Sequence, residues 1–361
     1  MFLALFIIMF IVLIIGFAYL LTRFRHLISH IYSPENKKGK ILAWVYAGIP
    51  LLALIIWSFA SPYAGAIFSL HLLIFWLLVD LAAIAVRLII KKPFIHGYRA
   101  IIALVITVIY MGVGYFLAHH VFETKYEIDT TKQIDPIRVV MFADSHVGAT
   151  FDGDGFAKYM EDIQQTSPDM VLISGDFVDD DTNKTDLVKS CEALGKLQTT
   201  YGVFYVNGNH DKGYSEYRDF SYDDMISELE KNNVIILEDE IYEADDFYII
   251  GRKDEIYKER LSVAELMEGL DPNKYTIVLD HRPNDYDSEV DAKCDLVLSG
   301  HTHGGQLFPI GQFAVLFGIN DANYGLKTID DSNFIVTSGL GDWAIPYKTF
   351  CIAEYCVIDI K

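Results

Sequence analysis

The segment GHTHGGQ, residues 300–306, places two histidines one residue apart between glycines, directly after an apolar run. Two histidines alone do not make a secure metal site, so further ligands must come from elsewhere in the chain. Four other apolar runs also end in a side chain of a type that binds metal ions. The residues that end the five runs are Asp144, Asp176, Asn209, His281 and His301. Carboxylate and imidazole groups without nearby thiolate suit Mn, Fe or Zn, so this pattern indicates a metal site.

The elements that must position these side chains are strands alternating with helices from Ile137 onward. Strands are expected at residues 137–143, 169–175, 202–208, 247–251, 275–280, 294–300, 333–338 and 350–359. Helices are expected at about 155–165, 185–198, 223–231 and 263–268. The alternation predicts an α/β domain. Sites in such sheets form beyond the carboxyl ends of the strands, so the five side chains should converge at one edge.

Five short motifs follow one another in a fixed order over roughly residues 137–358. They are DSH at 144–146, GDFVD at 175–179, GNHD at 208–211, the histidine of DHRP at 281 and GHTH at 300–303. This ordered set resembles the signature of the calcineurin-like metallophosphoesterases. The segments SGHTHGGQ and SGLGDWAIP resemble the bacterial membrane-associated phosphodiesterases of that family. The resemblance implies an α/β fold, a four-layer β-sandwich flanked by helices, and a metal-dependent phosphoric ester hydrolase.

The resemblance also implies a ligand set for two divalent ions. The first ion would take Asp144, His146, Asp176 and His303. The second ion would take Asp176, Asn209, His281 and His301, so that Asp176 bridges the pair. Two ions so placed clamp the attacking and leaving oxygens of a displacement and lower the pKa of a bound water.

Three further polar residues receive roles from the same resemblance. His210 is expected to protonate the leaving group, since imidazole titrates in the right range. Asp179 and Asp211 are expected to orient ligands and not to bind metal. Asp280, where relatives often have serine, is expected to add negative charge near the second ion. The segment PYKTFCIAEY, residues 346–355, replaces a segment that is richer in proline.

The first third of the chain is much more apolar than the rest. Apolar segments at residues 1–21, 41–60, 66–90 and 98–118 each have about the 20 residues that a membrane-spanning helix needs. We therefore expect a multi-pass transmembrane region with four helices over 1–120, a linker over 121–136 and the metallophosphoesterase domain over 137–361. Asp80, inside the third segment, is expected to hydrogen-bond to a neighbouring helix, and Arg87 is expected to extend toward the membrane surface.

The distribution of basic residues predicts the orientation in the cell membrane. Arg23, Arg25, Lys37, Lys38 and Lys40 follow the first apolar segment, and Lys91, Lys92 and Arg99 follow the third. The link between the second and third segments is uncharged. By the positive-inside rule the basic loops are cytoplasmic, so the catalytic domain should be extracytoplasmic.

Charge also restricts the partners. Residues 1–120 hold nine Lys or Arg and two Asp or Glu, so 20 basic and 47 acidic residues remain in 121–361. A region with a net charge of −27 repels polyanions, which excludes nucleic acid as the expected partner. The sequence gives no prediction of the oligomeric state.

We expect the substrate to be a phosphodiester or pyrophosphate, lipid-linked or belonging to the cell envelope, because the lipid bilayer anchors the domain. The apolar segment LFPIGQFAVLFGI, residues 307–319, is expected either to touch acyl chains or to form a buried hairpin. One alternative is a cytoplasmic-facing UDP-diacylglucosamine pyrophosphate hydrolase of lipid A synthesis, which needs the opposite topology. Another is a non-catalytic membrane sensor or scaffold, which would usually have lost ligands.

Overall fold

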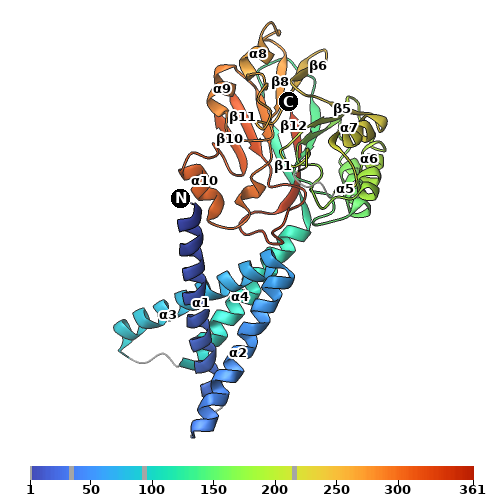
Figure 1. The fold of residues 1–361 in the computed structure, drawn as a ribbon. Coiled ribbons are helices and arrows are strands. Elements are labelled where there is room, and N and C mark those ends of the chain that lie inside the picture. The colour runs from blue at the N-terminus through green and yellow to red at the C-terminus, as the bar shows by residue number, and fades with distance from the viewer. Residues whose placement is uncertain (1, 32–35, 92–95, 214–217) are drawn as a thin grey trace. The chain divides into compact units, whose positions relative to one another are not determined.

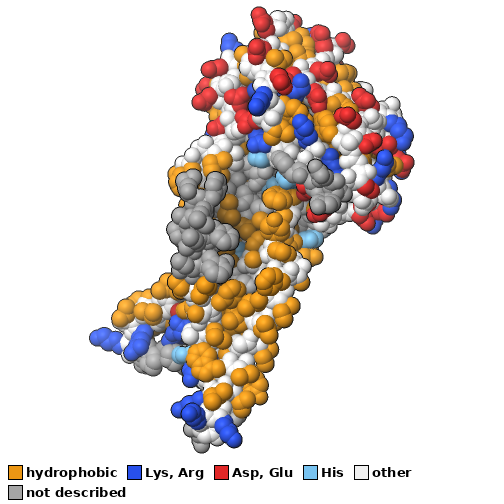
Figure 2. All heavy atoms as spheres, viewed as in Figure 1, with side chains coloured by type: hydrophobic (Ala, Val, Ile, Leu, Met, Phe, Trp, Pro, Cys, Tyr) orange, Lys and Arg blue, Asp and Glu red, His pale blue; other side chains and the backbone are white. Residues whose placement is uncertain are grey.

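The computed structural model describes residues 2–31, 36–91, 96–213 and 218–361 (Figure 1). The chain divides into two compact units, residues 1–113 and 114–361. The boundary lies inside a helix, several residues before the end of the transmembrane region that the sequence predicts. Hydrophobic side chains cover the helices of the first unit, whereas acidic and basic side chains are scattered over the sheet-containing unit (Figure 2).

The first unit is built from long helices. They are α1 (Phe2–Ile31), α2 (Lys37–Ala60), α3 (Pro62–Ile90) and the greater part of α4 (His96–His119). Among the described residues, three segments are long and apolar enough to cross a membrane: Lys37–Ala60, Pro62–Ile90 and Tyr98–His119. This count is three and not the four expected, and the side chains of residues 2–13 in the first expected span lie outside the described residues.

Polar contacts inside the first unit join α1, α3 and α4. The Tyr19 hydroxyl donates to Oδ2 of Asp80 over 2.7 Å, and Nε of Arg23 lies 2.7 Å from the same oxygen. Nη1 of Arg99 lies 3.5 Å from Oδ1. Asp80 is buried, and ionised groups in a membrane need such partners. The expected bond from Asp80 to a neighbouring helix is confirmed.

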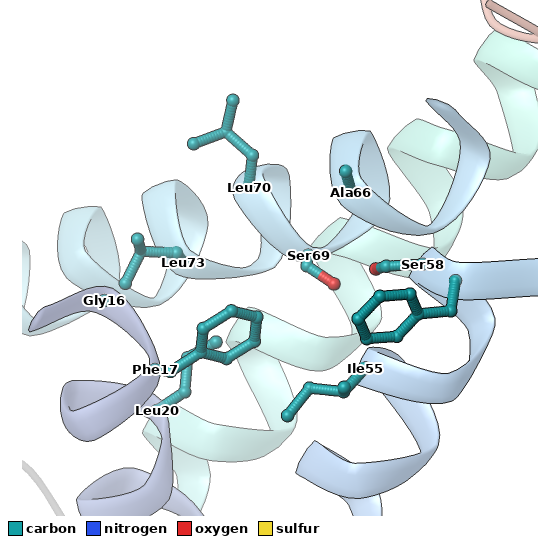
Figure 3. A pocket seen from close by; sticks show the side chains of 10 residues that line it. Gly16, Phe17, Leu20, Ile55, Ser58, Ala66, Ser69, Leu70 and Leu73 are labelled. Carbon is teal, nitrogen blue, oxygen red and sulfur yellow. The ribbon is translucent and has the colours of Figure 1, made fainter. Parts of the chain in front are cut away.

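A cavity of about 230 Å³ lies between α1, α2 and α3 (Figure 3). Its lining is almost entirely apolar and includes Phe17, Leu20 and Leu73, with Ser58 and Ser69 as the polar members.

Two six-stranded sheets make up the described part of the second unit. The first sheet has the order β1 (Val121–Ile128), β12 (Ala353–Ile360), β2 (Ile137–Phe142), β3 (Met170–Ser174), β4 (Gly202–Val206) and β5 (Val234–Ile236). The second has the order β10 (Gly325–Ile329), β11 (Ser332–Val336), β9 (Leu296–Ser299), β8 (Tyr275–Leu279), β7 (Phe247–Gly251) and β6 (Glu240–Glu243). Strands β2 to β5 are mutually parallel, as are β7, β8, β9 and β11.

The sheets pack face to face with helices outside (Figure 1). The first sheet is covered by α5 (Gly153–Gln165), α6 (Lys184–Leu194) and α7 (Tyr222–Lys231), and the second by α8 (Val263–Met267) and α9 (Tyr286–Asp291). One apolar core joins the inner faces of the two sheets and includes Leu172, Phe204 and Leu298. The parallel strands are buried on both faces, which explains why they read as continuous apolar runs. The four-layer α/β fold is confirmed.

The expected linker over 121–136 is wrong for its first half. Residues 121–128 form β1, which pairs in parallel with β12 from Val121 with Ala353 to Ile128 with Ile360. The strand lies at the edge of its sheet. From Phe122 to Glu127, partly buried side chains alternate with exposed ones along it. Charged residues therefore occupy alternate positions of the strand, and the segment lacks the continuous apolar run by which the other strands were predicted.

Residues 307–319 contain a short helix, α10 (Ile310–Leu316), that follows a 3-10 turn, η1 (His303–Gly305). Phe313, Leu316 and Phe317 are at least half exposed. The alternative of a buried hairpin is therefore wrong.

Candidate metal centre

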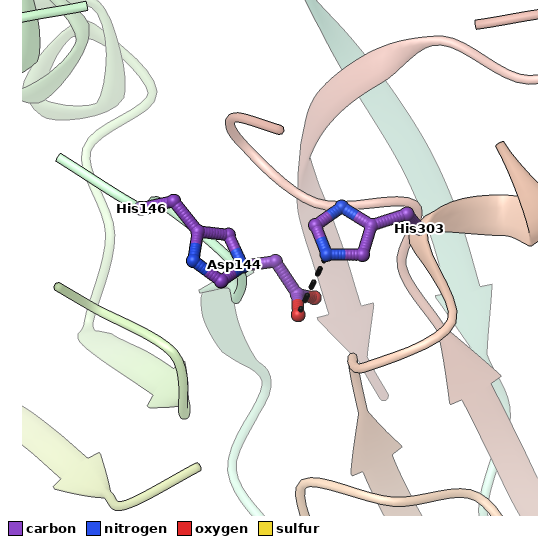
Figure 4. A group of neighbouring side chains, drawn as sticks. All are labelled: Asp144, His146 and His303. Atoms are coloured by element: carbon purple, nitrogen blue, oxygen red, sulfur yellow. Dashed lines mark ion pairs between the residues drawn. The ribbon is translucent and has the colours of Figure 1, made fainter. Parts of the chain in front are cut away.

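Three groups of acidic and histidine side chains that could hold a metal ion lie beyond the carboxyl ends of the central strands, and one of them, His146 with Asp179 and His210, shares His146 with the first group. The first contains Asp144 and His146, which follow β2, and His303, which lies in η1 after β9 (Figure 4). Nε2 of His303 lies 3.7 Å from Oδ1 of Asp144. All three side chains are buried.

The second group contains Asp176, which follows β3, with His281 after β8 and His301 after β9. Oδ2 of Asp176 lies 3.2 Å from Nε2 of His281. The same oxygen lies 3.8 Å from Nε2 of His146 in the first group. Asp176 thus stands between the two groups, which is the place that a bridging carboxylate requires.

Asn209 and His210 approach the same carboxylate from the end of β4. The backbone N–H of His210 donates to Oδ1 of Asp176 over 2.8 Å. A Cβ on Gly208 would lie 2.2 Å from that oxygen, so only glycine fits at this position. Asn209, which lies between Gly208 and His210 in the chain, is buried. The structure therefore brings six of the expected ligands together, namely Asp144, His146, Asp176, His281, His301 and His303, and it places the backbone of the seventh, Asn209, next to Asp176.

Three imidazoles in these groups are oriented through Nδ1. Nδ1 of His281 donates to the carbonyl oxygen of Ser174 over 2.8 Å, and Nδ1 of His303 donates to Oδ1 of Asp342 over 3.2 Å. Nδ1 of His146 lies 3.3 Å from Oδ2 of Asp179. Such contacts fix the ring orientation and turn Nε2 toward the centre.

Asp179 also contacts the expected proton donor. Its Oδ1 lies 3.1 Å from Nδ1 of His210, so one carboxylate orients His146 and His210 together. The rings of His210 and Trp343 are 5.3 Å apart between centroids, and Trp343 is 37% exposed. His210 therefore lies where the centre meets the surface.

The backbone at the centre is strained. Five of the expected ligands have positive φ angles between 40° and 69°: Asp144, His146, Asp176, His301 and His303. Side-chain-bearing residues adopt this region at a cost of about 1–3 kcal/mol each, and they do so mainly at functional sites. Glycine relieves crowding at one point of the turn, because a Cβ on Gly300 would lie 2.4 Å from Oδ2 of Asp144.

Asp211 holds the turn that carries Asp176. Its carboxylate accepts the backbone N–H groups of Asp176, Phe177, Val178 and Gly208 at 2.7–3.1 Å. The side chain is fully buried and directed at backbone, not at the two groups of ligands. These bonds position Asp176 through its main chain.

Two charged residues near the centre were missed by the sequence reasoning. Nζ of Lys348 lies 2.7 Å from Oδ1 of Asp342, the oxygen that accepts from His303, and it also donates to the carbonyl oxygen of Ser338 over 2.6 Å. Lys348 and Asp342 are almost completely buried. The segment DWAIPYK carries them and has no strand or helix pattern, so the one available signal was its resemblance to relatives.

The electrostatics separate the histidines into two kinds. Burial lowers the pKa of His301 and of His303 to about 3, so both rings are neutral at pH 7. Burial alone would also lower the pKa of His281, but the charge of Asp176 outweighs it and raises that pKa to about 10. His281 is therefore protonated in the metal-free protein.

These groups fit a pair of divalent ions. Nε2 of His146 is buried and makes no hydrogen bond. Oxygen and nitrogen donors without thiolate suit Mn, Fe or Zn. Buried polar atoms without partners are uncommon, and binding an ion would satisfy this nitrogen.

Asp280, which the sequence analysis expects to add negative charge near the second ion, is paired with two arginines. Its Oδ2 lies 2.7 Å from Nη1 of Arg252 and is also paired with Arg260. Arg252 pairs with Asp285 and Glu289 as well, so the two arginines serve a cluster of carboxylates. The carboxylate that stands at position 280, where relatives often have serine, is therefore accompanied by arginine partners.

A sequence model described as calcineurin-like phosphoesterase matches residues 137–305. The uncharacterised metallophosphoesterase YkoQ of Bacillus subtilis is 32% identical over 186 residues, which cover 49% of this chain and 67% of that protein. The chain belongs to the calcineurin-like metallophosphoesterases. Members of this family use a dinuclear centre of divalent metal ions, and the two groups of ligands are the candidates for holding it.

Other relatives of this metallophosphoesterase extend the similarity to membrane proteins. An uncharacterised metallophosphoesterase of Helicobacter pylori is 32% identical over 232 residues, 62% of this chain and 60% of its own length. A transmembrane protein with metallophosphoesterase domain from Bos taurus is 28% identical over 235 residues, 61% of this chain and 52% of that protein. The chain thus spans about 60% or less of these two proteins. The family match ends at residue 305, so α10, Asp342 and Lys348 lie beyond it.

Proposed function

We propose that the second unit is a metal-dependent phosphoester hydrolase. Asp144, His146, Asp176 and His303 would hold one divalent ion, and Asp176, Asn209, His281 and His301 would hold the other. The observation that carries this proposal is the place of Asp176, whose Oδ2 lies 3.2 Å from His281 and 3.8 Å from His146. When bound, Mn, Fe or Zn in these positions would provide a nucleophilic hydroxide near neutral pH and would neutralise phosphate charge.

His210 supplies the proton that the leaving oxygen needs. Its Nδ1 faces Asp179 at 3.1 Å, so Nε2 is the nitrogen turned away from that carboxylate. The side chain is 17% exposed, which is enough to meet a substrate at the rim of the centre. A positioned acid of this kind contributes about 10²–10⁴-fold to a rate.

The remaining polar residues hold this arrangement before substrate arrives. Asp211 fixes the main chain at Asp176 through four N–H groups, and Asp342 fixes the ring of His303. Preorganised groups need no rearrangement as charge develops, which is the main source of electrostatic stabilisation.

The proposal is tested on the full-length chain in detergent, with bis(p-nitrophenyl) phosphate as the substrate. Chelator-treated protein should regain hydrolysis when Mn, Fe or Zn is added. On a diester whose leaving alcohol is not activated, His210→Gln should lower kcat by about 10²-fold or more while the metal content stays the same. Equal hydrolysis by chelated and metal-loaded protein would contradict the proposal.

We further propose that the substrate is a lipid-linked or cell-envelope phosphodiester or pyrophosphate and that the domain is extracytoplasmic. The membrane-spanning segments confine the centre near the bilayer, and the exposed ring of Trp343 beside His210 offers an apolar contact at its rim. In nanodiscs, a long-chain phospholipid diester should be hydrolysed with a higher kcat/KM than its short-chain soluble analogue. A preference for the soluble ester would count against a lipid substrate.

A further inference from the structure

An exposed apolar surface of the second unit lies next to the metal centre. It consists of Phe308, Phe313, Leu316, Phe317 and Ile319 in and around α10, together with Phe350. Their exposed fractions run from 48% to 73%. Monomeric soluble proteins rarely leave such large side chains clustered in water, and such clusters mark sites of interaction with proteins or membranes.

Charge distinguishes this surface from the rest of its unit. Residues 307–319 contain no Asp, Glu, Lys or Arg, although residues 121–361 contain 67 of them in total. In the neighbouring segment 343–352 the one such residue is Lys348, and its side chain is fully buried. The surface therefore presents no ionised side chain to its partner.

A second observation connects this surface with a candidate membrane-spanning segment. The backbone N–H of Lys348 donates to the carbonyl oxygen of Gly114 over 2.9 Å, and the rings of Tyr347 and Tyr115 are 6.3 Å apart between centroids. Gly114 and Tyr115 belong to the second unit but also to the candidate span Tyr98–His119. At a rise of 1.5 Å per residue, Gly114 lies about 7.5 Å before the end of that span.

The segment around Lys348 is joined in turn to the start of α10. Thr349 donates its N–H to the carbonyl oxygen of Gln306 over 2.8 Å, and Phe308 donates its N–H to Oγ1 of Thr349 over 2.8 Å. The rings of Phe308 and Phe350 are 4.8 Å apart. The apolar surface is thus continuous with the end of a membrane-spanning helix.

We infer that α10 and Phe350 seat the catalytic unit on the bilayer, with their apolar side chains in the headgroup and upper acyl region. Aromatic and aliphatic side chains without charge suit that region. The centre then opens beside the membrane surface, because η1 carries His303 immediately before this surface. Contact of α10 and Phe350 with the bilayer does not require hydrolysis of any particular ester. The proposed function and the proposed membrane contact can therefore be refuted independently.

The test uses the full-length protein in nanodiscs with a nitroxide label on one introduced cysteine. The four native cysteines are buried, which favours selective labelling. Labels at Phe313→Cys, Leu316→Cys and Phe350→Cys should collide more with oxygen, which concentrates in lipid, than with a water-soluble nickel chelate. Glu192→Cys, exposed on α6, is the control and should show the opposite ratio.

Gln312→Cys provides a further position, because Gln312 is exposed on α10 and its replacement removes no apolar side chain. An oxygen-rich collision ratio at Gln312 and Phe313 supports the inference. A ratio like that of Glu192 at all four positions, Gln312, Phe313, Leu316 and Phe350, overturns the inference and shows that α10 faces water.

Discussion

Asp342 accepts a hydrogen bond from Nδ1 of His303 over 3.2 Å, and this bond sets the direction of a metal ligand from a segment that lies 39 residues further along the chain. The same oxygen of Asp342 is held at 2.7 Å by the buried ammonium group of Lys348. A carboxylate behind an imidazole fixes the ring and raises its basicity as a ligand.

Replacing Asp342 with Asn should therefore weaken metal binding at the His303 group by about 10–100-fold. The amide keeps the size of the side chain but lacks the charge that both His303 and Lys348 face. Binding of Mn to the chelator-treated full-length protein, followed by electron paramagnetic resonance, measures the effect. Asp331→Asn, on the exposed surface, is the control. Equal Mn affinity in both variants would show that Asp342 does not position His303.

Replacing Asp211 with Ala should destabilise the second unit. The substitution leaves the backbone N–H groups of Asp176, Phe177, Val178 and Gly208 without their acceptor. Unsatisfied buried groups cost about 1–3 kcal/mol, so we expect a loss of roughly 3 kcal/mol in the free energy of unfolding. The Tm of the full-length protein in detergent should fall, whereas Glu259→Ala at an exposed position should leave it unchanged. An unaltered Tm in both would refute the role of Asp211 as a backbone clamp.

Metal binding should release at least one proton at pH 8. The nearby carboxylate of Asp176 overcomes the effect of burial and raises the pKa of His281 to about 10, so the ring is cationic below that pH. A histidine ligand binds as neutral imidazole, so the ion displaces this proton and its affinity increases as the pH rises toward 10. Calorimetry in two buffers of different ionisation enthalpy measures the released protons. His281→Gln should lose one of them, and heats that do not depend on the buffer would disprove the protonation of His281.

The sequence was sufficient to predict the buried strands and the residues that follow them. Asp144, Asp176 and His301 come directly after runs such as IRVVMFA, DMVLISG and CDLVLSG, which form β2, β3 and β9. Parallel strands buried on both faces give continuous apolar runs, and the carboxyl ends of such strands meet at one edge. Both signals are local in the chain, which is why a single sequence reveals them.

The elements that escaped prediction depend on contacts across long separations. Strand β1 is polar at alternate positions, and its partner β12 lies more than 200 residues away. Helix α10 has no polar face by which a helical period could be recognised. The contacts of Lys348 with Gly114 and of Asp342 with His303 link three distant parts of the chain through a segment without regular structure. No local pattern encodes such contacts.

The orientation in the membrane gives a further prediction. The basic residues near Arg23 and Lys91 predict by the positive-inside rule that those loops are cytoplasmic, so the second unit should face outward. Protease added to intact spheroplasts of a bacterium expressing the chain should cleave the second unit from outside. Cleavage only after lysis would show that the second unit faces the cytoplasm. It would favour a nucleotide-linked lipid precursor as the substrate.

The most direct test of the proposed centre combines metal content and hydrolysis in one preparation of the full-length protein. Asp176→Asn is compared with Asp181→Asn, an exposed neighbour on the same loop. The wild type and Asp181→Asn should each bind two ions per chain and hydrolyse bis(p-nitrophenyl) phosphate. Asp176→Asn should bind fewer ions and lose at least about 10²-fold in kcat, because both proposed ligand sets include the carboxylate of Asp176. Unchanged metal content and activity in Asp176→Asn would contradict a dinuclear centre built on this residue.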